Sequence, residues 1–140
     1  MNLLRAGLSL LAVTQVAVGG WALVAPRSFF DDGPFPGVHW VAMFPPYNEH
    51  LMRDFGALNL ALCAVLVFAA VTLEKTLTRA VLTGYVVFAV PHFVFHLNHL
   101  EHMPFADQAG NVVSLAAAVL LPLALLPLTR SAAGDVIRNA

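Results

Sequence analysis

Three histidines recur at helical spacing in the third apolar segment of the sequence. His92, His96 and His99 stand at positions i, i+4 and i+7, so a helix would place them on one face, and Tyr85 extends that face by two turns. Pro91 precedes them and would remove one backbone hydrogen bond. Imidazole binds iron, copper and zinc, and it also titrates near neutral pH. This face is therefore a candidate for metal binding or proton transfer.

Two further pairs of ionisable residues stand where the second apolar segment begins. His50 and Asp54 are four residues apart and share one face of a helix. The same face continues through Ala57 and Ala61, whose small side chains would let a neighbouring helix approach closely. Glu49 and Arg53 share a neighbouring face, and they form either part of a site or a solvated pair at the helix start. Asn48 precedes them and is a favoured N-cap residue.

The start of the fourth apolar segment carries a third polar stripe, made by Asp107, Asn111 and Ser114 at the same i, i+4 and i+7 spacing. A charged group at membrane depth costs about 2.5–3.5 kcal/mol and seldom faces lipid. We therefore expect the three stripes to turn inward and meet near one face of the membrane.

The first functional hypothesis is a transition metal or haem site for redox chemistry. Bundle metal sites collect side chains from facing helices, and carboxylates added to imidazole favour iron or manganese over copper or zinc. Haem held between His50 and a histidine of the third segment is a variant. The candidate ligands are His92, His96, His50, Glu49, Asp54 and Asp107, with His99, Asn111 and Tyr85 as further candidates.

Two alternatives need no metal. A cluster of histidines and carboxylates could act as an acid/base site on a lipid-like substrate, or as a proton relay. The chain could instead be a structural or assembly subunit of a larger membrane complex, whose polar core only fixes helix register. Small residues also permit a homodimer, namely Gly19, Gly20, Ala57, Ala61 and Gly84. The residue pattern leaves open whether the protein is an enzyme.

The composition is that of a membrane protein. Of the 140 residues, 59% are hydrophobic and only 11% are charged, far from the average of soluble domains. The basic residues form no cluster, which excludes a nucleic-acid interface. Cys63 is the single cysteine, so no disulfide forms within the chain. The first apolar run lacks a convincing cleavage site and is read as a retained helix, not a signal peptide.

Four apolar segments are long enough to cross a bilayer, which takes about 17–25 helical residues. They cover about residues 3–24, 55–73, 80–97 and 111–128. Residues 26–48 are rich in glycine and proline and are predicted to form an outer interfacial loop. The predicted fold class is all-α, with residues 1–140 forming one domain, an integral membrane four-helix bundle.

Basic residues predict the orientation, because cytoplasmic loops carry the excess of lysine and arginine. One side of the predicted bundle holds Arg5, Lys75, Arg79, Arg130 and Arg138. The other holds only Arg27 and Arg53. We therefore expect both termini to be cytoplasmic and the protein to lie in the inner or plasma membrane.

This orientation places all six histidines in the outer half or the outer loops. They are His39, His50, His92, His96, His99 and His102. Aromatic residues are expected to form a belt at the outer interface. These are Trp21, Phe29, Phe30, Phe35, Trp40, Phe44 and Tyr47.

Two stretches resemble a known group of membrane proteins. They are Gly-Gly-Trp at 19–21, before the proline that ends the first span, and Arg-Asp-Phe-Gly-Ala-Leu-Asn-Leu-Ala-Leu at 53–62. Together with four short helices and Arg5 near the start, they are similar to the broad DoxX-like group of small bacterial membrane proteins. The resemblance implies a four-helix membrane fold, and some members are associated with quinone-linked redox chemistry. It assigns no functional residue.

Overall fold

A computed structural model describes residues 3–101 and 103–131, which form helices and no strand. The long helices are α1 (Leu3–Val24), α3 (Glu49–Thr72), α4 (Lys75–Leu97) and α5 (Phe105–Leu125), and the short ones are α2 (Pro26–Asp32) and α6 (Leu128–Ser131). All four long helices are long and apolar enough to span a membrane. The predicted all-α fold with four candidate spans is confirmed. His102 and Arg138, which entered the predicted topology, lie outside the described residues.

Helix α1 covers the predicted residues 3–24, whereas α3, α4 and α5 each begin five or six residues before the apolar segment that predicted them. The Asn48 side chain accepts a hydrogen bond from the Leu51 amide at 3.1 Å, so α3 begins at Glu49 and not near residue 55. The predicted N-cap at Asn48 is confirmed. Glu74 caps α4 in the same way, by accepting from the Thr76 and Leu77 amides. Caps are polar, so a helix starts before its apolar part does.

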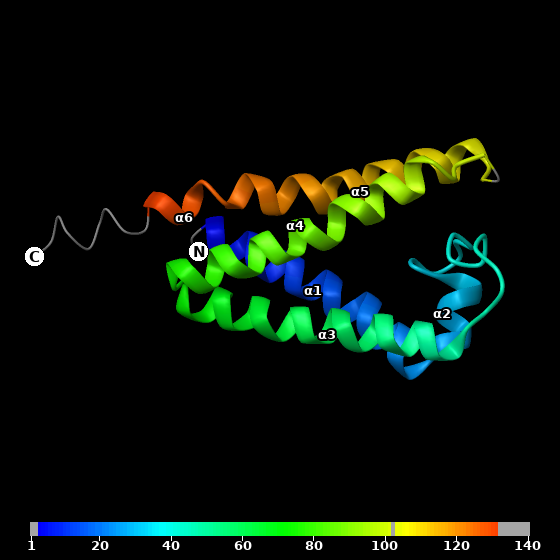
Figure 1. Cartoon of the computed structure of the whole chain (residues 1–140), viewed down its shortest axis with the longest axis horizontal. Coiled ribbons are helices and arrows are strands. Elements are labelled where there is room, and N and C mark those ends of the chain that lie inside the picture. The colour runs from blue at the N-terminus through cyan, green and yellow to red at the C-terminus, as the bar shows by residue number, and fades with distance from the viewer. Residues whose placement is uncertain (1–2, 102, 132–140) are drawn as a thin grey trace, which may run out of the picture.

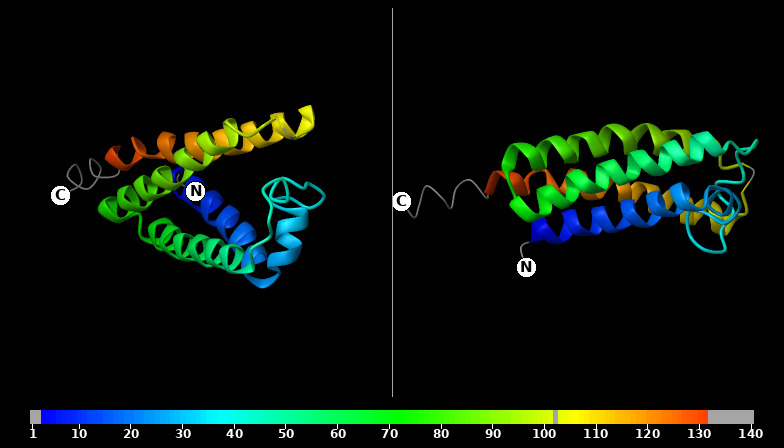
Figure 2. Two further views of the ribbon diagram at one scale, coloured as in Figure 1. Left: turned by 45° about the vertical axis from the view of Figure 1, so that its right-hand side comes forward. Right: turned by 90° about the horizontal axis from the view of Figure 1, so that it is seen from below.

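The long helices form two pairs, α1 with α3 and α4 with α5 (Figure 1). The pairs lie close together at the end that holds both described termini and diverge toward the other end, where α2 and residues 33–48 lie (Figures 1 and 2). The hydrophobic core includes Leu8, Leu66 and Leu82, which have no exposed surface.

Small residues bring α1 and α3 together, but they are not those expected from the polar stripe of α3. Ala57 and Ala61 are exposed, whereas Gly56 is buried against Gly19 of α1. One residue turns a helix by about 100°, so the stripe through Ala57 points away from α1. The expectation that Ala57 and Ala61 seat a neighbouring helix is wrong within this chain.

Residues 26–48 form an ordered cap and not a fifth span. Phe29, Phe30 and Trp40 are buried, so these three aromatic side chains pack inside the cap and do not face outward as a belt. The Trp40 indole lies against Gly110 of α5, and Phe30 packs edge-on to Tyr47 at 5.3 Å between ring centroids. The part of the cap after α2 thus reaches the start of α5.

Candidate functional site

The α4 histidines His92 and His96 contact each other, with ring centroids 4.8 Å apart. Both side chains are half-buried. Phe88, one turn before His92, stacks on it at 5.4 Å, and Phe44 of the cap packs edge-on to His96 at 5.2 Å. The predicted helical spacing therefore produces one imidazole pair, held between aromatic rings.

Aromatic contacts continue from this pair to α3 and α2. Phe29 of α2 stacks on Phe55 of α3 at 5.8 Å, and Phe55 reaches Phe88 of α4 at 6.5 Å. We call the whole series the aromatic arc; it consists of Phe29, Phe55, Phe88, His92, His96 and Phe44. It joins the cap, through Phe29 and Phe44, to α3 and α4 where the helix pairs diverge.

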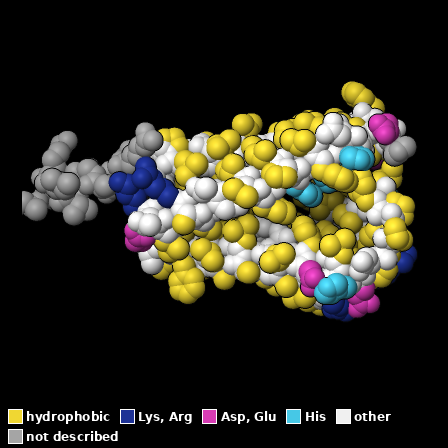
Figure 3. Space-filling model, viewed as in Figure 1, with side chains coloured by type: hydrophobic (Ala, Val, Ile, Leu, Met, Phe, Trp, Pro, Cys, Tyr) yellow, Lys and Arg dark blue, Asp and Glu magenta, His cyan; other side chains and the backbone are white. Residues whose placement is uncertain are grey.

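Figure 3 shows that the surface is hollowed in this region, between α4 and the side of the molecule formed by α2 and α3. Histidine side chains lie on both sides of the hollow, and hydrophobic side chains surround it (Figure 3). The face shown carries its histidines in the half away from the start of α1 and the end of α5 (Figure 3).

Three buried polar atoms near this end have no hydrogen-bond partner among the described residues. They are Nδ1 of His96, Nε1 of Trp40 and Oδ1 of Asn111, which come from α4, the cap and α5. A buried polar group without a partner costs about 1–3 kcal/mol, so native proteins seldom leave one unused. These atoms are available to a bound polar group.

His99 does not join the imidazole pair, although it has the helical spacing to do so. It is exposed, its Nδ1 lies 2.7 Å from its own helix's Phe95 carbonyl oxygen, and its ring stacks on Phe95 at 4.2 Å. This local hydrogen bond satisfies Nδ1 and turns the ring aside.

The polar stripe of α3 lies on the surface. His50 Nε2 is 3.1 Å from Asp54 Oδ2, but the two side chains are 85% and 56% exposed. Glu49 pairs with Arg53 at 2.8 Å, and Arg53 also donates to the Leu23 carbonyl at the end of α1. The expected inward turn of His50 and Asp54 is wrong, because the first turns of α3 extend past its apolar part and each charge finds a partner four residues away.

The remaining candidates are dispersed. Asn111 is buried and Asp107 half-buried on α5, and Ser114 donates back to the Asn111 carbonyl. Tyr85 lies in the core, where its hydroxyl accepts a hydrogen bond from Gln15 of α1 at 2.8 Å. Tyr85 therefore ties α4 to α1 and is not part of the histidine site.

No group of three or more histidine, cysteine, aspartate or glutamate side chains close enough to hold a metal ion occurs within residues 3–101 and 103–131. The structure brings together His92 with His96 and His50 with Asp54, but it does not join the two pairs to a third stripe. The sequence analysis missed Phe44 and Trp40 as parts of the site. In the sequence, Phe44 and Trp40 stand out only as aromatic residues of a loop. Aromatic character alone does not show which of these rings pack against the helices.

No protein-family model matches the chain, and no curated protein or solved structure is significantly similar to it. The resemblance to the DoxX-like group stays a prediction.

Proposed function

We propose that the chain is a multi-pass protein of the inner or plasma membrane, with both termini in the cytoplasm and a binding site for a lipid-like molecule in its outer half. Four helices of sufficient length and apolar character support the membrane location. The excess of lysine and arginine near the termini supports the orientation.

The buried Nδ1 of His96, which has no hydrogen-bond partner within residues 3–101 and 103–131, carries the proposal of a binding site. Small-molecule sites are mostly apolar, with a few polar atoms that orient the ligand. Here the aromatic arc supplies the apolar surface, and His96, which lies between Phe44 and His92, supplies the polar atom. A molecule with a planar or aliphatic body and a carbonyl or hydroxyl head fits this combination, and a quinone is one such molecule.

The imidazole pair can do more than bind. Neutral imidazole donates from one ring nitrogen and accepts at the other, so His96 can hydrogen-bond a carbonyl or a hydroxyl head according to its tautomer. His92, 4.8 Å away, offers a second exchangeable proton position. We propose that the pair exchanges a proton with a bound molecule whose head is a hydroxyl: the hydroxyl gives its proton to the unprotonated ring nitrogen of His96 and takes one back from it.

A metal or haem remains the other reading of the same histidines. The pair supplies two ligands from one helix, and the described residues place no third ionisable ligand beside it. Structural zinc sites take four protein ligands and catalytic ones three. The number of ligands therefore favours the metal-free form of the site over a metal ion held by protein side chains alone. Haem takes only one or two axial ligands, so the quantification of metal and haem below tests that form.

The test is quinone binding to the protein in mild detergent, measured by quenching of tryptophan fluorescence. We expect a short-chain quinone to bind the parent and to bind His96→Phe about tenfold more weakly, because one hydrogen bond is lost while the aromatic shape remains. His99→Phe is the matched control, since the His99 ring is exposed and bonded to its own backbone. Equal weakening in both variants, or no binding by the parent, contradicts the proposal.

Metal analysis of the same preparations separates the two readings. Iron, copper, manganese, zinc and haem are quantified in the parent and in a His92→Ala/His96→Ala double variant. We expect no stoichiometric metal in the parent. About one metal or haem per chain, lost in a double variant that keeps its helix content, would replace the metal-free site with a metal centre.

A further inference from the structure

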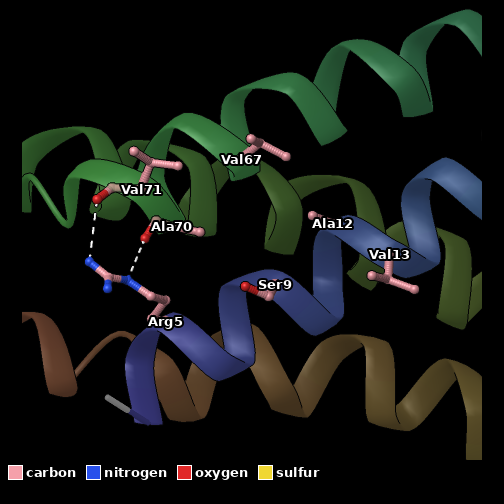
Figure 4. A pocket seen from close by; sticks show the side chains of 7 residues that line it. All are labelled: Arg5, Ser9, Ala12, Val13, Val67, Ala70 and Val71. Atoms are coloured by element: carbon pink, nitrogen blue, oxygen red, sulfur yellow. Dashed lines mark hydrogen bonds between the residues drawn. The ribbon is translucent and has the colours of Figure 1, made fainter. Parts of the chain in front are cut away.

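A groove of about 440 Å³ lies between the first half of α1 and the last turns of α3 (Figure 4). Its polar lining residues are Arg5 and Ser9, and the other side chains that line it are alanines and valines. Small-molecule sites span about 300–1,000 Å³, so the groove is large enough to bind a small molecule. It is separate from the aromatic arc, which lies at the other end of the helices.

Arg5 reaches from α1 across to the end of α3. Its Nε donates to the Ala70 carbonyl at 2.9 Å and its Nη2 to the Val71 carbonyl at 3.3 Å (Figure 4). These carbonyls belong to the last turn of α3, which has no helical donors left for them. A guanidinium has five N–H groups, so two hydrogen bonds leave most of them available.

The charge of Arg5 is not neutralised by the described part of the chain. The described residues form four ion pairs, and none of them includes Arg5. The basic partners of these pairs are Arg27, His39, His50 and Arg53. The side chain is exposed at the mouth of the groove. An anion bound here would meet an uncompensated positive charge.

The groove changes from polar to apolar along its length. Ser9 follows Arg5 by one turn, is exposed, and makes no hydrogen bond through its hydroxyl within the described residues. Beyond it, Ala12, Val13 and Val67 form apolar walls (Figure 4). A phospholipid has the same sequence of groups, a polar phosphate followed by an apolar hydrocarbon chain.

We propose that this groove binds one anionic phospholipid of the surrounding membrane, with its phosphate on Arg5 and Ser9 and an acyl chain along Ala12, Val13 and Val67. Basic pockets between membrane helices on the cytoplasmic side recognise such headgroups. The inference rests on the proposed membrane insertion and orientation, and it is independent of the site at His96.

Native mass spectrometry of the detergent-purified protein tests the proposal. Phosphatidylglycerol and phosphatidylcholine with identical acyl chains are added to equal concentration. We expect the parent to retain phosphatidylglycerol about fivefold better, the effect of one arginine near the membrane surface. Arg5→Gln should remove the preference. Arg79→Gln should keep it, because Arg79 lies near the same end but donates to Thr129 outside the groove.

A second variant covers the case in which Arg5 is also needed to hold α3. Ser9→Phe fills the groove and leaves Arg5 in place, so it should reduce retention of both lipids at unchanged helix content and unchanged quinone binding. Equal retention of both lipids by the parent overturns the inference, and so does a preference that survives both Arg5→Gln and Ser9→Phe. Competition by glycerol phosphate at the lipid's own concentration would also overturn it, because the apolar walls would then contribute nothing.

Discussion

Gly19 of α1 and Gly56 of α3 each occupy the space where the other would need a side chain. A Cβ on Gly56 would lie 2.7 Å from the Gly19 carbonyl oxygen, and a Cβ on Gly19 would lie 2.9 Å from the Gly56 carbonyl oxygen. Both distances are shorter than a van der Waals contact, and the atoms met are backbone atoms that cannot rotate away. The two backbones thus approach as closely as glycine permits.

Gly56→Ala should therefore force α1 and α3 apart. We expect a loss of about 1–3 kcal/mol in the free energy of unfolding, the usual cost of inserting atoms into a packed interface. Denaturant unfolding in detergent, followed by circular dichroism, measures it. Gly84→Ala is the control, because a Cβ at Gly84 meets no atom within 4 Å and alanine is the better helix former. Equal effects of the two substitutions would refute the close contact.

Trp40 and Gly110 attach the cap to α5. A Cβ on Gly110 would lie 3.0 Å from Cζ2 of Trp40, so Gly110→Leu should displace the indole. We expect the Trp40 emission to shift to the red in a Trp21→Phe background, and the quinone affinity to fall as Phe44 moves with the cap. Ala109→Leu, at an exposed neighbouring position, should leave both unchanged. If the Trp40 emission of Gly110→Leu stays at the wavelength of a buried tryptophan, the cap does not depend on this contact.

The Gln15–Tyr85 hydrogen bond links the two helix pairs inside the core. Tyr85→Phe removes the acceptor of Gln15 Nε2, and hydrogen bonds between membrane helices contribute about 0.6 kcal/mol on average and up to about 1.7. We expect a stability loss in that range by unfolding measurements. In a Gln15→Leu background the same change should cost less, and an undiminished cost would mean that Tyr85 acts through packing alone.

The exposed His50–Asp54 pair should matter little. Surface ion pairs contribute about 0–1 kcal/mol, and both side chains here are more than half exposed. Asp54→Asn is therefore expected to change the unfolding free energy by less than about 1 kcal/mol and the quinone affinity not at all. A clear loss of quinone affinity would show that His50 and Asp54 contribute to the binding site.

Glu74 makes the start of α4 sensitive to acid. Its carboxylate accepts hydrogen bonds from the Leu77 and Thr76 amides, which lower its pKa below the usual range. A group with a lowered folded pKa stabilises the protein above its unfolded pKa, and this stabilisation is lost as the pH falls through the folded value. Glu74→Gln should therefore be less stable than the parent at about pH 7, and the difference should shrink below about pH 4. Melting curves across this range check it, and a difference independent of pH would rule out the charged cap.

Sequence patterns determined the elements of this protein because those patterns act locally. Runs of apolar residues predicted four helices of spanning length, Asn48 predicted the start of α3, and i, i+4 spacing predicted that His92 and His96 would meet. Each of these depends on neighbours within one or two turns. The predicted helices started too late where an N-cap such as Glu74 begins the helix in polar sequence.

Tertiary structure decided which of these local patterns form a site. The spacing of His50 with Asp54 is as regular as that of His92 with His96, yet one pair is exposed and the other is enclosed by aromatic rings. The difference comes from Phe44, which a turn-rich loop brings back onto α4 from far along the chain. Periodicity along one helix fixes which residues share a face, but only packing between helices fixes what that face meets.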